Sequence, residues 1–104
     1  ENLNDLELLK HLSLNNNILN KIEGIEKLHH LESLYLHNNK INKIENIYDC
    51  IKLLYIDLSS NYIEFIDEQT EYQLAKIPNC DILLCTNITD TKGKQIYTIL
   101  YNKK

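Results

Sequence analysis

The stretch LYLHNNKINKIENI, residues 34–47, combines regularly spaced apolar residues with the polar pair Asn38–Asn39 at its centre. Its first residues alternate between apolar and polar side chains, as a half-buried strand does. Its second half instead carries Ile41, Ile44 and Ile47 at every third position, which suits tight turns. The stretch therefore predicts a short strand that bends at the asparagines and returns through turns.

The same pattern recurs at an interval of 22 residues, which indicates a repeat protein. Leu9, Leu31 and Leu53 mark the starts of three successive repeats. Further columns keep the same phase: Leu12/Leu34/Ile56, Leu14/Leu36/Leu58, Asn17/Asn39/Asn61, Leu19/Ile41/Ile63 and Ile22/Ile44/Ile66. One coil of this kind cannot bury its apolar face alone, so we expect successive coils to stack and share a core.

Asn17, Asn39 and Asn61 share the phase of the inward leucines, so we expect their side chains inside the stack. Where the chain leaves each strand, backbone N–H and C=O groups lose their sheet partners, and each group left unsatisfied costs about 1–3 kcal/mol. A carboxamide can donate to and accept from such groups at once. The column is therefore predicted to form a structural asparagine ladder, whereas Asn38 is expected to be an exposed turn residue.

The spacing L-x-x-L-x-L-x-x-N-x-[LI]-x-x-I resembles that of leucine-rich repeats. Its regular length and isoleucine-rich second half, from Leu3 to about Cys85, resemble the subfamily typified by a repeat-built regulatory subunit of protein phosphatase 1. The motifs KIEGIEKL and KIENI also resemble ciliary and axonemal leucine-rich-repeat proteins. The resemblance implies an α/β fold: a right-handed leucine-rich-repeat solenoid with parallel strands on the concave face, short 3-10 or irregular returns on the convex face, and short helices near the C-terminus.

We expect a single leucine-rich-repeat domain over residues 1–104, cut from a longer protein. Leu3 and Leu6 have the phases of the end of an earlier coil, and residue 1 is not methionine. The expected boundaries are 1–8 for the end of an earlier repeat, then 9–30, 31–52 and 53–79, and 80–104 for a terminal repeat or cap.

The last repeat departs from the regular spacing. After Leu53 the next matching start is Cys80, 27 residues later, which puts Leu83 and Cys85 in the inward strand phases. This interval is longer than the regular 22 residues, and we expect the additional residues in the return that precedes Cys80.

Those residues predict a short helix within DEQTEYQLAKIPN. Asp67 is a suitable N-cap, acidic residues follow in the first turn, the helix is expected to reach about Lys76, and Pro78 ends it. Further on, the spacing of Ile96, Ile99 and Leu100 favours a small capping helix. The segment IYTILY is equally rich in strand formers, so both alternatives stay open there.

Composition limits the class of protein. The 104 residues are 43% apolar and 25% charged, which fits one ordinary domain. The formal net charge is -4 and the basic residues are scattered lysines, which argues against nucleic acid as a partner. No apolar run is long enough to span a membrane, and the start ENLNDLELL lacks a secretory pattern. We therefore expect a cytoplasmic or nuclear location.

Few residues indicate chemistry. Cys50, Cys80 and Cys85 occupy leucine phases and are expected to be buried, reduced thiols, because their number and spacing suggest neither a disulfide framework nor a zinc site. The histidines lack metal-ligand spacing. His37, Asp57 and Ser59 are expected near one another, but an open sheet offers no pocket or oxyanion hole. We predict no catalytic residue, no metal and no cofactor.

The outward positions of the predicted strands form the remaining candidate surface. They lie in three rows, written from the first strand to the last: His11, Ser33, Tyr55, Ile82; Ser13, Tyr35, Asp57, Leu84; and Asn15, His37, Ser59, Thr86. Tyrosine supplies rigid contact area and is enriched in protein interfaces. We therefore predict a partner-binding patch made of His11, Ser13, Tyr35, His37, Tyr55, Asp57 and Leu84.

These observations favour an intracellular, non-enzymatic module that binds another protein on its concave face. The resemblance implies two versions, a regulator of the phosphatase 1 catalytic subunit or a ciliary protein that serves dynein or another cytoskeletal component. A targeting arm of a larger multidomain protein is a third alternative. Nucleic acid, membranes and small-molecule substrates are not expected as ligands.

Overall fold

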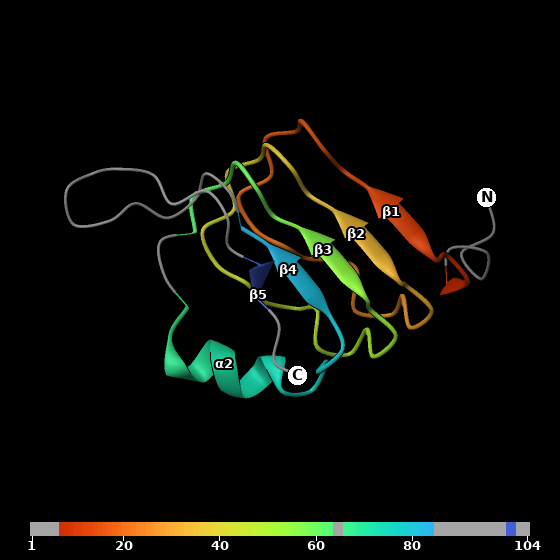
Figure 1. The fold of residues 1–104 in the computed structure, drawn as a ribbon. Coiled ribbons are helices and arrows are strands. Elements are labelled where there is room, and N and C mark those ends of the chain that lie inside the picture. The colour runs from red at the N-terminus through yellow and green to blue at the C-terminus, as the bar shows by residue number, and fades with distance from the viewer. Residues whose placement is uncertain (1–6, 64–65, 85–99, 102–104) are drawn as a thin grey trace.

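The computed structural model describes residues 7–63, 66–84 and 100–101, and a five-stranded sheet forms one side of it (Figure 1). The strands follow one another in space in the order of the sequence. β1 to β4 are parallel, and β5 is antiparallel to β4. Their bounds are His11–Ser13 for β1, Ser33–Tyr35 for β2, Tyr55–Asp57 for β3, Asp81–Leu83 for β4 and Leu100–Tyr101 for β5. The parallel strands confirm the predicted solenoid.

The first three strands pair in the register that the 22-residue repeat predicts. Leu12 lies beside Leu34, and Leu34 beside Ile56. Leu34 and Ile56 are fully buried, whereas the residues on either side of them in their strands are partly exposed. This alternation places one side of every strand in the core and leaves the other side as a surface.

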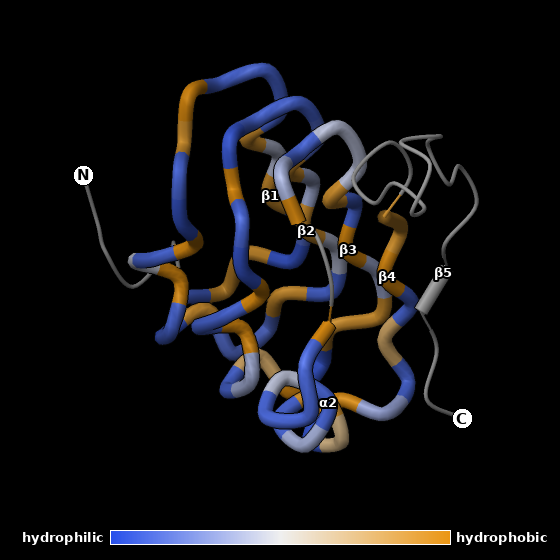
Figure 2. Tube along the Cα trace, turned by 90° about the vertical axis from the view of Figure 1, so that its left-hand side faces the viewer, coloured by the Kyte–Doolittle hydropathy of each residue, from blue (hydrophilic) through white to orange (hydrophobic). Residues whose placement is uncertain are grey.

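The returns supply the other half of the core. Ile25, Ile44, Ile47 and Cys50 are buried there, and Figure 2 shows hydrophobic segments both along the strands and along the returns. Short-range bonds such as Cys50 N to Ile47 O, at 3.1 Å, close turns of three residues. The three-residue spacing of the isoleucines is thus explained, because each tight turn brings the next apolar side chain inward.

The asparagine ladder is present in the middle of the stack. Asn39 is 4% exposed; its Nδ2 donates to Leu14 O and Leu36 O, both at 3.0 Å, and its Oδ1 accepts from Leu19 N at 3.1 Å. Asn61 repeats this arrangement one coil later. Each side chain therefore joins its own turn to that of the preceding coil.

The neighbouring turn position has a different role. Asn16, Asn38 and Ser60 have positive φ angles of 61°, 61° and 57°, and Asn38 is exposed. Asparagine tolerates this left-handed conformation better than most residues. The Asn38–Asn39 pair therefore combines an exposed turn residue with a buried ladder residue, as predicted.

The prediction that Asn17 is buried is wrong. Its Nδ2 reaches Leu14 O at 2.8 Å and Asn15 O at 3.1 Å, but the side chain is exposed. In the described part of the chain, coil 9–30 has a neighbour on one side only. The motif alone thus positions the amide, and a preceding coil would be needed to bury it.

The predicted orientation of the last repeat is also wrong. Cys80 is buried as expected, but β4 follows it one residue earlier than the repeat spacing implies, so that Ile82 pairs with Ile56. A shift of one residue moves every side chain to the opposite face of a sheet. Ile82 and Leu84 are consequently buried, at 1% and 0% exposure, and Leu83 is partly exposed. Leu84 therefore does not belong to the candidate surface, and Cys85 and Thr86 lie outside the described residues.

The helix of the lengthened return is confirmed. α2 spans Glu68–Leu74 and lies among the returns, away from the strand layer (Figure 1). Asp67 caps it by accepting a hydrogen bond from Thr70 N at 2.8 Å. Leu74 anchors the helix in the core. Among the described residues, no helix has the length and apolar character needed to cross a membrane.

At the C-terminus the strand alternative holds for Leu100. Leu100 pairs with Leu83, and Tyr101 with Ile82, in an antiparallel ladder. The predicted helix is therefore wrong at Leu100, and its residues 96–99 lie outside the described ranges. Leu100 and Tyr101 find backbone partners along β4, which a helix at these two residues would leave unpaired.

Candidate functional site: the outer sheet face

The outward side chains of β1 to β4 form a surface that we call the outer sheet face. Its residues, two from each strand, are His11, Ser13, Ser33, Tyr35, Tyr55, Asp57, Asp81 and Leu83. The two from β1 are exposed and the others are partly exposed. The structure therefore brings together six predicted positions, His11, Ser13, Ser33, Tyr35, Tyr55 and Asp57, in the predicted register.

Two tyrosines occupy the middle of this face. Tyr35 on β2 and Tyr55 on β3 have ring centroids 5.8 Å apart and planes inclined by 55°. Tilted aromatic pairs at this separation attract each other, so each ring helps to fix the other. The pair is a preformed aromatic contact surface on rigid strands.

A hydrogen-bonded network lies beside the tyrosines, at the carboxyl ends of the strands. Ser59 Oγ donates to Asp57 Oδ1 at 2.6 Å, and Ser59 N donates to the same oxygen at 3.0 Å. His37 Nδ1 lies 2.8 Å from Ser59 Oγ. Because the serine proton points to the carboxylate, His37 Nδ1 must carry the proton and donate. The network fixes one oxygen of Asp57.

This order of groups differs from that of a hydrolytic triad. In a triad the histidine lies between the acid and the serine and takes the serine proton. Here Ser59 lies between His37 and Asp57, and it is buried. The histidine acts as a donor to the serine oxygen, so it does not activate this oxygen as a nucleophile. The three residues are close together, as predicted, in an arrangement that serves structure.

His37 is also held from the opposite side. Its backbone N–H donates to Asn15 Oδ1 at 2.7 Å, so neighbouring coils are joined here by side chains as well as by the sheet. His37 is partly exposed at the rim of the outer sheet face. Asn15, His37 and Ser59, the described residues of the predicted third row, thus contribute mainly to joining the coils.

Sequence reasoning missed Asp81 and Leu83. β4 begins one residue earlier than the repeat spacing implies. Asp81 and Leu83 therefore take the outward positions that were predicted for Ile82 and Leu84. As a result Asp81 lies beside Tyr55, just as Asp57 lies beside Tyr35. The run DILL has apolar residues in both phases, so its pattern gives no signal for the shift.

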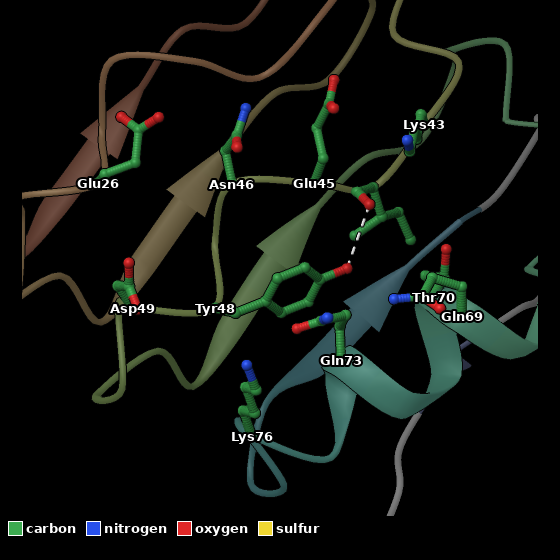
Figure 3. A pocket seen from close by; sticks show the side chains of 11 residues that line it. Glu26, Lys43, Glu45, Asn46, Tyr48, Asp49, Gln69, Thr70, Gln73 and Lys76 are labelled. Carbon is green, nitrogen blue, oxygen red and sulfur yellow. Dashed lines mark hydrogen bonds between the residues drawn. The ribbon is translucent and has the colours of Figure 1, made fainter.

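A second feature lies on the return side of the molecule. A polar groove of about 370 Å³ runs between residues 43–49 and α2 (Figure 3). Three carboxylates, two lysines and several amides line it around Tyr48. The Tyr48 hydroxyl donates to Ile44 O at 3.1 Å, and burial, followed by the nearby Asp67 and Glu45 carboxylates, raises the pKa of Tyr48 to about 12. The phenol therefore stays protonated, and the groove is a hydrogen-bonding surface without an activated group.

Metal ligands and thiols are the remaining candidates for chemistry among the described residues. No three His, Cys, Asp or Glu side chains gather as a metal site within 7–63, 66–84 and 100–101. Cys50 and Cys80 are buried free thiols. Burial, followed by neighbouring carboxylates, raises the pKa of Cys50 to about 11 and that of Cys80 to about 12. These two thiols are therefore core residues, as predicted.

Comparison with known proteins points to one family. A family profile described as leucine-rich repeats, two copies, matches residues 7–49 and 29–76. Among solved structures, internalin InlF from Listeria monocytogenes superposes with a TM-score of 0.67 at 27% identity, covering 86% of this chain and 26% of that chain. Internalin C2 from the same organism gives 0.65 at 28% identity, with 82% and 36% covered. The functional domain of InlJ gives 0.65 at 25% identity, with 86% and 19% covered.

The match therefore extends over about a third or less of each internalin chain. No sequence among curated proteins matches the chain. The likeness concerns the repeat fold.

Proposed function

Because the chain belongs to the leucine-rich-repeat family, we propose that it binds another protein through its outer sheet face. Arrays of this family generally serve as protein interaction modules. The observation that carries the proposal is the Tyr35–Tyr55 ring pair, which lies partly exposed in the centre of the face. Tyrosines on a rigid sheet lose little conformational entropy on binding, which is why they dominate many interfaces.

A binding role is better supported than a catalytic one. Ser59 is buried and donates to Asp57, and the described residues provide no metal cluster. The outer sheet face offers two tyrosines in its centre, and aromatic residues are enriched in protein interfaces. We therefore propose a non-enzymatic function.

The identity of the partner is proposed from sequence resemblance alone. The phosphatase 1 catalytic subunit is our first candidate, and a dynein-associated or other cytoskeletal protein is the second. A role as the targeting arm of a larger multidomain protein is a third version. A cytoplasmic or nuclear location is part of the same proposal, and fractionation of the source cells checks it.

The test is affinity capture with variants of the face. The double variant Tyr35→Ala/Tyr55→Ala should fold but recover the partner about tenfold less well, since each truncation removes a central aromatic contact. Tyr72→Ala is the matched control, because Tyr72 lies on α2 and is 72% exposed. Bound proteins are quantified by mass spectrometry, and circular dichroism checks the fold.

Recovery that is equal for the wild type and the double variant would show that the outer sheet face is not the interface. A loss confined to Tyr72→Ala would instead move the interface to α2 and the return side.

A further inference from the structure

On the premise that the outer sheet face is the binding surface, we propose that it recognises a basic side chain of the partner protein, best an arginine. The site lies between Tyr35, Tyr55 and Asp57. The occupant follows from the chemistry of these three groups, two aromatic rings and one carboxylate on adjacent strands.

The two rings form the aromatic part of this site. A cation is attracted to an aromatic face within about 6 Å of the ring centroid. The centroids of Tyr35 and Tyr55 are only 5.8 Å apart, so the rings contact each other, and a cation against the outward side of the pair lies within reach of both. The 55° inclination shows that the rings do not stack face to face, and both residues are partly exposed.

Asp57 supplies the opposite charge at the correct place. It pairs in register with Tyr35 on the adjacent strand, where neighbouring backbones lie about 4.8 Å apart. Ser59 holds Oδ1 of Asp57 through two hydrogen bonds, at 2.6 and 3.0 Å. The carboxylate is thereby oriented before the ligand arrives, and its second oxygen can accept from a cationic donor.

The charges of the surrounding face favour the same occupant. No outward position of β1 to β4 is a lysine. Lys21 and Glu23 form an ion pair within the described ranges, and both residues lie outside the strands. Asp81 beside Tyr55 adds a second Tyr–Asp pair next to the first. An anionic partner would therefore meet repulsion on this face, and a basic one would be attracted.

Arginine fits these groups better than lysine does. Its planar guanidinium can lie on a tyrosine ring while an N–H group at its edge points to a carboxylate. The ammonium of lysine is more strongly hydrated and has no plane to stack. The site therefore predicts the preference arginine, then lysine, then a neutral side chain of the same shape.

The experiment is an NMR titration of the full chain in low-salt buffer. The two probes are N-acetyl-arginine methylamide and N-acetyl-citrulline methylamide, which have nearly the same shape but differ in charge. We expect saturable shifts at the Tyr35 and Tyr55 rings and at the Asp57 amide, with a Kd about tenfold lower for the arginine probe. Equal affinities for the two probes would overturn the proposal.

Three variants assign the effect to the site. Tyr35→Phe keeps the ring and should keep the preference for arginine, whereas Tyr35→Leu and Asp57→Asn should each reduce the preference several-fold. Amide spectra that superpose on those of the wild type away from the site show that a variant is folded. An arginine preference that survives in both Tyr35→Leu and Asp57→Asn, or shifts gathered at the polar groove around Tyr48, would contradict the site.

The titration and the capture experiment can fail independently. If both probes bind equally while the double tyrosine variant still loses its partner, the face is an interface with different chemistry. If the arginine probe binds with the expected preference but capture does not depend on the tyrosines, the cation site exists and the proposed function is wrong.

Discussion

Coils 9–30 and 31–52 carry the same residue types in the same phases, but only the second has a described coil on both sides. Leu34 is fully buried, whereas Leu12, its in-register partner, is partly exposed. Asn39 is buried and Asn17 is exposed. The repeat motif therefore fixes where a side chain points, and the neighbouring coils decide how much of it is buried.

The other end of the stack differs from the middle in another way. Ile82 follows Ile56 by 26 residues, where the regular coils use 22. The longer return contains α2, and β4 still pairs with β3 in a normal parallel register. The sheet thus keeps its geometry because the return, at the surface, absorbs the change in length.

The largest effect is expected where this irregular end meets the core. Leu84→Lys should lower the free energy of unfolding by about 4 kcal/mol or more, because it buries a charge that has no partner. Leu83→Lys should change the same quantity by less than about 0.5 kcal/mol, because Leu83 is partly exposed and lies beside Asp57. Urea denaturation of the two variants, followed by circular dichroism, provides the comparison.

If Leu83→Lys instead lowered the free energy of unfolding more than Leu84→Lys, Leu83 would point inward, as regular repeat spacing implies. Similar losses for both variants would mean that both side chains are in the core.

Leu83 and Leu84 also show why the sequence predicts the regular coils better than the last repeat. Between Leu9 and Ile63 the interval is constant, so periodicity identifies the inward residues of the strands and the strand register. After Cys80 the inward positions depend on a single residue of spacing, and DILL is apolar in both phases. The burial of Leu84 is therefore a tertiary property, set by hydrogen bonding of β4 to β3.

A smaller but still large difference is expected along the asparagine ladder. Asn39→Leu should lower the free energy of unfolding by about 3 kcal/mol, because Leu14 O, Leu36 O and Leu19 N lose their partner in a buried place. Asn17→Leu should cost less than about 1 kcal/mol, since water can replace its exposed bonds. Thermal and urea unfolding measure both variants.

Losses of equal size at Asn17 and Asn39 would show that the amides stabilise only their own turns. The neighbour-dependent part of the ladder would then be negligible.

The candidate site was predictable to a similar extent. Tyr35, Tyr55 and Asp57 lie on regular strands, and the repeat alone places them on one face. The orientation of Asp57 by Ser59 and the tilt between the tyrosine rings depend on side-chain geometry that periodicity does not encode. The arrival of Asp81 on the face depends on the irregular return.

The smallest expected effect concerns α2, the helix in the return between β3 and β4. The hydrogen bond from Thr70 N to Asp67 holds the pKa of the Asp67 carboxyl below its ordinary value, with a further contribution from Lys43. A lowered pKa means that the ionised cap stabilises the fold above about pH 4 and that this stabilisation is lost as the pH falls through the pKa of the folded state. Asp67→Asn keeps a good N-cap without a titrating group, so the stability of the wild type relative to this variant should decline on acidification. Unfolding of both proteins by urea between neutral and acidic pH measures that difference, and all other carboxylates cancel because they are shared. A difference that is independent of pH would mean that the carboxylate charge does not contribute to the cap, and that the helix is held in the return by the burial of Leu74 instead.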